Sequence, residues 1–238
     1  MISFIRSPHR IFESFLIGAL ISLISLPASA MDMINVVVYG DSLTSGYKLP
    51  SEDSYADQMG KKLRDLGYVN VKTINMSVPG ETSSGGLERV SSLILQEPDV
   101  VVLELGANDI LRGTSVHTIN RNLANIITKL REKDVYIVLI GMYAPPNLGA
   151  GYSGQIKAMY ANLATYYKLA FYPFALDGIF GNPDMNLADG YHPNGKGIGL
   201  MVDKTLHMVD AGVRWKYEVL RQREEYERGW QESQSPAR

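Results

Sequence analysis

Five short apolar runs recur along the chain, and between them apolar residues return every three or four positions. The runs are continuous and rich in Val and Ile, as expected for strands that are buried on both faces of a sheet. They span residues 34–39, 69–74, 100–105, 135–140 and, more weakly, 171–174. This alternation of strands and helices predicts an α/β protein with a parallel sheet covered by helices.

Three of the intervening segments carry apolar stripes with helical spacing, at residues 119–130, 156–167 and 198–209. Such stripes indicate helix faces that pack on a core. From Arg214 onward the sequence becomes dense in charge and ends in polar residues, which favours a solvated helix that ends in a disordered tail. We therefore expect one domain over residues 31–213 and a charged tail, helical or disordered, over residues 214–238.

The first thirty residues follow a different pattern. Basic residues precede an apolar run over residues 15–26, and the small-residue sequence ASA follows at residues 28–30. This order is typical of a secretory signal peptide, and the run is shorter than the roughly 20 residues that a membrane span needs. We expect residues 1–30 to be a signal peptide, and the mature protein to be periplasmic or secreted without a stable membrane anchor.

Composition then narrows the possible chemistry. The 238 residues suffice for one α/β domain with a sizeable core. A formal net charge of -2 gives no reason to expect a nucleic-acid or anionic-membrane partner. The 0 cysteines exclude disulfides, thiolate nucleophiles and Cys-ligated metals, and the 4 histidines argue against a multi-His metal site. We expect no metal in this protein.

Polar residues follow three of the predicted strands at the point where each ends. The sequence Gly-Asp-Ser at residues 40–42 follows the first strand, residues 75–86 follow the second, and residues 106–109 follow the third. In an open parallel sheet, sites lie beyond the carboxyl ends of the strands, where the strand order reverses. If the first strand lies between the second and the third, as in a flavodoxin-like order, these loops meet in one crevice.

Ser42 is a candidate nucleophile in this crevice, and a neutral serine needs a base. His192 lies in a loop bounded by Gly and Pro, and Asp189 precedes it by three residues. This spacing lets the carboxylate reach the imidazole Nδ1 and leaves Nε2 free to accept the Ser42 proton. A D-x-x-H sequence alone is a weak signal, but this one follows the last strand and so lies at the same sheet edge.

Three groups could donate hydrogen bonds to an oxyanion in the crevice. They are the backbone N–H of Ser42, which we expect at the start of a helix, the backbone N–H of Gly80, and the side-chain amide of Asn108. Each residue also has an ordinary interpretation as a turn or capping residue, but their convergence favours a site. Asp41 is expected to accept backbone N–H bonds and hold the turn that carries Ser42.

The blocks GDSLTSGY, the loop around Gly80, GANDILRG and DGYHPN resemble, in the same order, the four sequence blocks of the SGNH (GDSL-type) hydrolases. The resemblance extends over residues 36–209 and is especially clear for bacterial periplasmic arylesterases and the acyl-CoA thioesterase I/lysophospholipase L1 group. It implies a flavodoxin-like three-layer α/β/α fold with a five-stranded parallel sheet. It also implies hydrolysis through an acyl-serine intermediate, without a cofactor.

The same resemblance implies a role for each candidate residue. Ser42 would be the nucleophile, His192 the general base and Asp189 the acid that orients it. The Ser42 amide, Gly80 and Asn108 would form the oxyanion hole.

The expected activity is that of a serine esterase. Its substrate would be a small-molecule ester or lipid: an aryl or short-to-medium acyl ester, a thioester or a lysophospholipid. Two alternatives stay open, a carbohydrate acetylesterase and a non-catalytic exported protein that binds a lipid or acyl ligand. Leu111 and Arg112 are expected to line an acyl pocket, together with Pro145 in a long loop over residues 142–154. The sequence does not indicate an oligomeric state.

Overall fold

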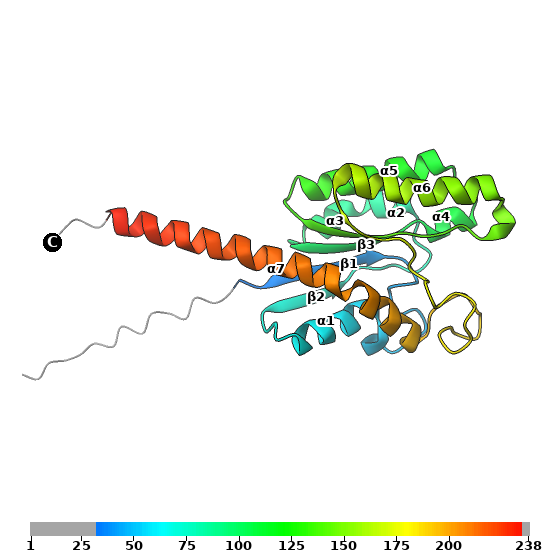
Figure 1. Cartoon of the computed structure of the whole chain (residues 1–238), viewed down its shortest axis with the longest axis horizontal. Helices are drawn as coiled ribbons and strands as arrows, with labels where there is room; N and C mark the ends of the chain where they lie inside the picture. The colour runs from blue at the N-terminus through cyan, green and yellow to red at the C-terminus, as the bar shows by residue number, and fades with distance from the viewer. Residues whose placement is uncertain (1–31, 235–238) are drawn as a thin grey trace, which may run out of the picture. The chain divides into compact units, whose positions relative to one another are not determined.

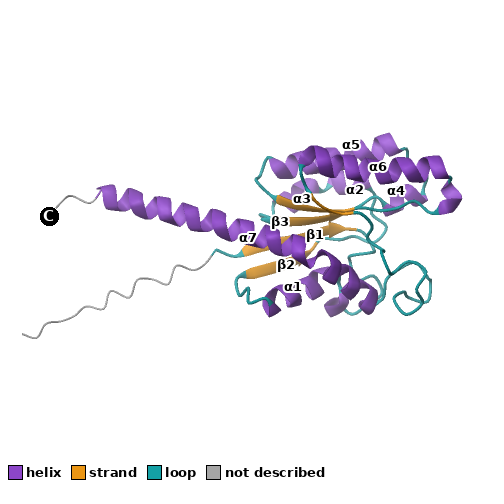
Figure 2. Ribbon diagram, in the orientation of Figure 1, coloured by secondary structure: helices purple, strands orange, loops and turns teal. Residues whose placement is uncertain are grey.

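The computed structural model describes residues 32–234, so the predicted signal peptide over residues 1–30 and the last four residues lie outside the described part of the chain. Five strands form one parallel sheet in the order β2-β1-β3-β4-β5 (Figure 2), which confirms the predicted fold class and places β1 between β2 and β3. The strands are β1 (Ile34–Gly40), β2 (Val71–Asn75), β3 (Val100–Glu104), β4 (Tyr136–Ile140) and β5 (Ala170–Tyr172).

The central strands form the buried middle of the sheet, whereas β2 and β5 form its edges. Every residue of β3 is buried, and the register of β1 against β3 places Gly40 opposite Glu104 at their carboxyl ends. The second strand begins two residues later than predicted, because Val69 is 88% exposed and precedes the paired residues. The register therefore brings the loops after β1 and β3 to the same end of the sheet.

Helices cover both faces of the sheet, as Figure 1 shows. One face carries α2 (Ser83–Glu88), α3 (Val90–Ile94), α5 (Val116–Arg131) and α6 (Ala150–Tyr167). The other face carries α1 (Tyr55–Asp65) and α7 (Gly195–Gln234). The short helix α4 (Ala107–Leu111) directly follows β3, and the 3₁₀ turns η1 (Ser51–Asp53) and η2 (Pro146–Leu148) lie in connections.

Helix α5 shows how the sequence sets these elements. The Ser115 hydroxyl accepts the Thr118 N–H at its start, a capping bond that satisfies one otherwise free donor. Basic residues lie in its last turn, where they interact favourably with the negative end of the helix dipole. Its buried residues are Ile119, Asn122, Leu123, Ile126, Ile127 and Leu130, which confirms the predicted apolar stripe.

The loop predicted over residues 142–154 is shorter in the structure. Residues 146–148 form η2, and α6 begins at Ala150. Gly151 and Gly154, which fall within the predicted loop, both lie in α6. Gly149, with φ of +88°, supplies the sharp entry to the helix, a backbone conformation that glycine adopts without strain.

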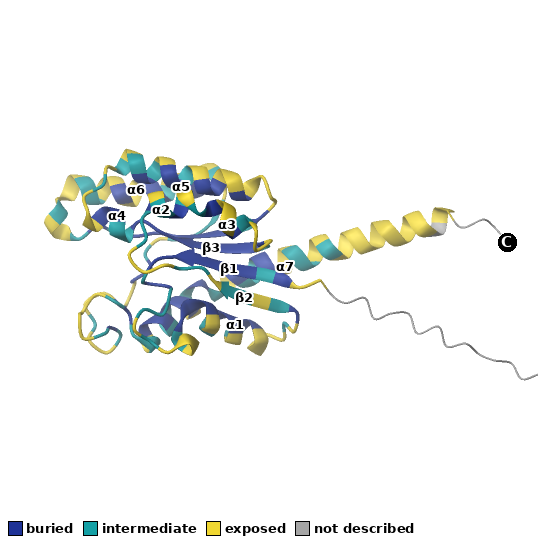
Figure 3. Cartoon of the chain, turned by 180° about the vertical axis from the view of Figure 1, so that it is seen from behind, coloured by how far each residue is buried: buried dark blue, intermediate teal, exposed yellow. Residues whose placement is uncertain are grey.

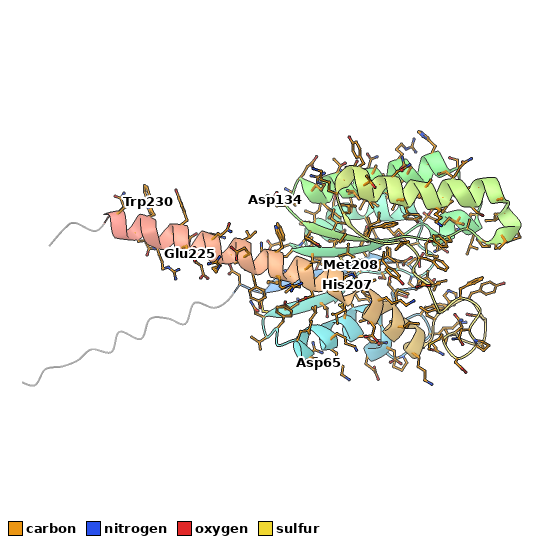
Figure 4. The ribbon with its side chains drawn as sticks, in the orientation of Figure 1. Asp65, Asp134, His207, Met208, Glu225 and Trp230 are labelled. Carbon is orange, nitrogen blue, oxygen red and sulfur yellow. The ribbon has the colours of Figure 1, made fainter. Side chains whose placement is uncertain are left out.

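Helix α7 continues without a break through the expected boundary between residues 213 and 214. Its residues up to Val213 include several that are completely buried, whereas residues 221–231 are exposed (Figure 3). Figure 4 shows His207 and Met208 in the part of α7 that lies against the domain, and Glu225 and Trp230 in the distal part. In the described chain, no helix combines the length and apolar character needed to span a membrane.

Candidate active site

The turn after β1 presents Ser42, which is half-buried. Residues 42–48 form a run of turns, and α1 begins only at Tyr55, after its capping residue Ser54. The expectation that Ser42 starts a helix is therefore wrong. The backbone of Gly46 and of Lys48 adopts positive φ, which ends any helical continuation of the turn.

Ser42, His192 and Asp189 lie in line, although 150 positions of sequence separate the first two. The Nε2 atom of His192 lies 3.0 Å from the Oγ atom of Ser42. The Nδ1 atom of the same ring lies 2.9 Å from Oδ2 of Asp189. These distances are those of a nucleophile, a base and an orienting acid that are joined by hydrogen bonds.

Asp189 and His192 belong to a loop that closes on itself. Oδ1 of Asp189 accepts the backbone N–H groups of Tyr191 and His192, both at 3.0 Å. These bonds, together with the imidazole bond, hold the pKa of the Asp189 carboxyl well below its usual range. The Leu187 N–H donates to the His192 carbonyl at 2.8 Å, so the loop presents an ionised Asp189 beside the ring.

Asn108 joins the loops that follow three strands. It lies in α4, which follows Gly106 at a φ of +122°. Its side-chain amide donates to Oδ2 of Asp41 at 3.0 Å and to the Glu81 carbonyl at 2.9 Å. Because an amide nitrogen has only two protons, an oxyanion must share or replace one of these bonds to use Asn108 as a donor.

The loop around Gly80 is fixed beside the Ser42 turn. The Val78 N–H donates to the Gly40 carbonyl at 3.0 Å, and the Glu81 N–H donates to the Val78 carbonyl at 3.1 Å. Gly80 itself is exposed and has a φ of +81°. The loop thus holds Gly80 in a conformation that favours glycine over any residue with a side chain.

The three residues expected to line an acyl pocket have different surroundings. Arg112 directs Nη2 to the Gly80 carbonyl at 3.3 Å, so its guanidinium helps to hold the Gly80 loop. Leu111 ends α4 and is 65% exposed. Pro145 is half-buried at the start of η2. The contribution of these residues to a pocket stays a prediction.

Asp41 holds the nucleophile turn as expected, and its neighbour Glu104 is a further residue of the site that was not predicted. Oδ1 of Asp41 accepts the Leu43 N–H at 3.0 Å, and both carboxyl groups are completely buried. Burial raises the pKa of Asp41 to about 6. Burial and the adjacent Asp41 charge raise the pKa of Glu104 well above its usual range. The sequence feature that could have indicated Glu104 is an acidic residue at the end of an otherwise apolar strand.

A second buried network, which was not predicted, fixes the start of α2. Oδ2 of Asp109 accepts the Ser83 N–H at 2.7 Å, and its Oδ1 accepts the Ser83 hydroxyl at 2.8 Å. The Asn122 amide donates to the same hydroxyl at 3.1 Å. The loops that carry Gly80 and Asn108 are therefore joined on their buried side as well.

The assembled groups are those that acyl transfer requires: a hydroxyl, a base held by an acid, and N–H donors on adjacent loops. Within residues 32–234, no three His, Cys, Asp or Glu side chains are grouped so as to hold a metal ion.

Comparison with known proteins agrees with this chemistry. Residues 38–200 match the model of the GDSL-like Lipase/Acylhydrolase family. The chain is 35% identical over 182 residues to Esterase TesA of Pseudomonas aeruginosa, covering 76% of this chain and 90% of that protein. It is 34% identical over 176 residues to an arylesterase of Vibrio mimicus, covering 74% and 88%. The crystal structure of the psychrotrophic esterase EstA from Pseudoalteromonas sp., inhibited by monoethylphosphonate, superposes with a TM-score of 0.70 at 30% identity, covering 76% of this chain and 98% of EstA.

Proposed function

The chain belongs to the GDSL-like lipase/acylhydrolase family and is an esterase of that family, and we propose that it hydrolyses aryl and short-to-medium acyl esters through an acyl intermediate on Ser42. The observation that carries the proposal is the hydrogen-bonded line from Ser42 through His192 to Asp189. A protein that only binds a ligand has no use for a base placed 3.0 Å from a serine hydroxyl.

Acylation begins when Ser42 Oγ attacks the ester carbonyl carbon and its proton passes to Nε2 of His192. The imidazole can accept that proton because its other proton lies on Nδ1, donated to Asp189. The resulting imidazolium is stabilised by the ionised carboxylate 2.9 Å away. His192 then gives the proton to the leaving alcohol oxygen as the carbon–oxygen bond breaks, and the acyl group remains on Ser42.

Deacylation repeats these steps with water as the nucleophile. His192 removes a proton from the water, whose oxygen attacks the acyl carbon. The Ser42 oxygen leaves and recovers the proton from His192, which releases the carboxylic acid. Each step returns His192 and Asp189 to their starting protonation, so the cycle needs no other reactant.

The oxyanion of each tetrahedral intermediate would be bound by the N–H groups of Ser42 and Gly80 and by the Asn108 amide. The Asn108 amide is already held between Asp41 and Glu81, so little reorganisation is needed when charge develops. Its bond to the neutral Glu81 carbonyl is the weaker competitor for an anion. We therefore assign that proton to the oxyanion.

The proposed substrate class follows from the relatives and from the exposure of the site. One relative is described as an arylesterase, and Leu111 offers an apolar side chain that is 65% exposed, three residues after Asn108. An exposed apolar side chain on the helix that carries Asn108 favours aryl or acyl groups over sugars. Thioesters and lysophospholipids share the reacting carbonyl and belong in the same test.

The test is a series of p-nitrophenyl esters of rising acyl length, with matched thioesters, on the chain from residue 32 onward. We expect turnover that Ser42→Ala abolishes and that Ser45→Ala, a serine of the same turn, leaves intact. Mass spectrometry after treatment with an organophosphonate should place the adduct on Ser42. Equal inactivity of the wild type and Ser42→Ala on every ester, or an adduct on another residue, would reject the proposal.

We also propose that the protein acts outside the cytoplasm. The support is the order of basic, apolar and small residues over positions 1–30. Cell fractionation followed by N-terminal sequencing should find a mature chain that begins at Met31. A cytoplasmic protein that retains these residues would contradict this proposal.

A further inference from the structure

Behind the nucleophile turn lie two carboxyl groups that the reaction does not use directly. Asp41 follows β1, and Glu104 ends the neighbouring β3. Both are 0% exposed, and they are adjacent, because the Asp41 N–H donates to Oε2 of Glu104 at 3.3 Å. Two carboxylates in such a site cannot both be ionised without a large penalty, because burial and mutual repulsion act in the same direction.

The surroundings of Glu104 offer it little compensation for a charge. Its Oε2 accepts the Asp41 N–H at 3.3 Å and the Thr44 hydroxyl at 3.4 Å, both long bonds. Its Oε1 is buried without a partner among the described residues. Besides Asp41, Glu104 interacts electrostatically with Tyr160 of α6, which cannot carry a positive charge, and the charge of His192 acts on Asp41. An ionised Glu104 would be uncompensated.

Asp41, in contrast, is surrounded by donors. Its Oδ1 accepts the Leu43 N–H at 3.0 Å, and its Oδ2 accepts the Asn108 amide at 3.0 Å. Donors favour the charged form of a carboxyl group. The single negative charge that the pair can hold therefore belongs on Asp41, and the proton belongs on Glu104.

We propose that Glu104 is a positioning residue for the oxyanion hole: it remains protonated, donates its proton to Asp41, and so keeps Asp41 as the anion that holds the Asn108 amide. The same side chain accepts the N–H of Asp41, the residue immediately before Ser42. One buried acid thus helps to position two of the three proposed oxyanion donors, the Asn108 amide and the Ser42 N–H. The effect of Glu104 on catalysis rests on the proposed function, whereas the location of the proton does not.

Gly40 makes this arrangement possible. A Cβ atom at position 40 would clash first with the Thr44 hydroxyl oxygen, and it would lie 2.8 Å from the Glu104 carbonyl oxygen and 2.9 Å from Oε2 of Glu104, closer than real Cβ contacts allow. Only glycine lets the Glu104 carboxyl approach the backbone of the nucleophile turn. The first glycine of the Gly-Asp-Ser sequence is therefore explained by the close approach of both Thr44 and the buried acid opposite it.

Infrared spectroscopy tests the shared proton without reference to catalysis. At pH 8 the wild type should show the carbonyl band of a protonated carboxylic acid, Ser42→Ala should retain it, and Glu104→Gln should lose it. A wild type without this band, or a band that persists in Glu104→Gln, would overturn the proposal. If no ester is hydrolysed, the proposed function fails while this measurement still decides the protonation.

Kinetics test the positioning role. Glu104→Gln keeps a neutral donor and acceptor of the same size, so it should retain the kcat of the wild type and lose less activity at alkaline pH. Glu104→Leu should lower kcat about 10²-fold with KM unchanged, as expected when a catalytic donor is misplaced. The double variant Glu104→Leu/Asn108→Ala should have the same kcat as Asn108→Ala alone, because both substitutions remove the same donor.

Thr205→Val is the matched control, because it removes a buried 2.6 Å hydrogen bond to Tyr55 between α1 and α7. It should lower the melting temperature and leave kcat and the pH profile unchanged. Full activity in folded Glu104→Leu, or an alkaline profile of Glu104→Gln identical to that of the wild type, would show that Glu104 has no positioning role.

Discussion

Replacing Asp189 with Asn tests the base and its orienting acid with little change in shape. In the wild type, Oδ1 of Asp189 accepts two backbone N–H groups and Oδ2 faces Nδ1 of His192 at 2.9 Å. The Asn oxygen can keep the backbone bonds, so the loop should keep its conformation. The Asn NH₂ group then faces Nδ1 and donates to it, which places the imidazole proton on Nε2 and prevents that atom from accepting the Ser42 proton.

The size of the loss follows from two contributions. Two unit charges about 4 Å apart interact by about 1 kcal/mol in water and about 4 kcal/mol near a protein surface. The side chains of His192 and Asp189 are 27% and 34% exposed, which places the lost stabilisation of the imidazolium between these limits. Restoring the productive tautomer breaks one hydrogen bond, at about 1–3 kcal/mol. Together they sum to about 2–7 kcal/mol and predict a fall in kcat of roughly 30- to 10⁵-fold.

The assay is steady-state hydrolysis of p-nitrophenyl butyrate, with the melting temperature measured on the same samples. Asp184→Asn, an exposed acid earlier in the same segment, is the control and should leave kcat unchanged. If Asp189→Asn keeps the melting temperature and kcat stays within tenfold of the wild type, the carboxylate neither fixes the tautomer nor stabilises the imidazolium, and the reasoning is refuted.

The remaining predictions concern the oxyanion donors and the buried acids. Asn108→Ala should raise the activation barrier by about 2.7–4 kcal/mol with little change in KM, and an unchanged kcat would remove Asn108 from the oxyanion hole. Gly80→Ala should lower kcat and the melting temperature together, because a side chain at a φ of +81° costs about 1–2 kcal/mol; an unchanged kcat and melting temperature would show that this loop conformation does not require glycine. Asp41→Asn should remove a pH dependence of stability. The pKa of Asp41 is raised to about 6 by burial, so its stabilising contribution is present below pH 4 and is lost as pH rises to 6 and above, by up to ~3 kcal/mol. Thermal unfolding from pH 4 to 8 should therefore show a melting temperature of Asp41→Asn that rises relative to the wild type, and parallel curves would contradict this.

The sequence was sufficient to predict the sheet and the grouping of loops, because both depend on patterns with a clear physical period. Continuous apolar runs mark strands buried on both faces, and the strand order then forces the loops after β1, β2 and β3 to one edge. The line of Ser42, His192 and Asp189 follows from the same logic, since a serine nucleophile needs a base.

Features that depend on local backbone geometry could not be predicted in this way. The turn after Ser42 fails to become a helix because Gly46 and Lys48 adopt positive φ, and the identity of Lys48 gives no sign of this conformation. Arg112 bonds to the Gly80 carbonyl, a contact between loops that no periodicity reports. The burial of Glu104 could not be predicted either, because a single acid at a strand end is usually solvated. Its position opposite Gly40 and its complete burial are seen only in the folded structure.

The closed loop that carries Asp189 and His192 has a consequence for protein engineering. Its ends are joined by an antiparallel bridge between Asn186 and Pro193, and Asn194 then accepts two N–H groups at the start of α7. The Asn186 amide also donates to the carbonyls of Ile179 and Asn182, so the relative placement of acid and base is fixed largely within residues 179–194. Such a segment is a transplantable unit: grafted before a helix at the carboxyl edge of another parallel sheet, it would bring a correctly paired acid and base with it.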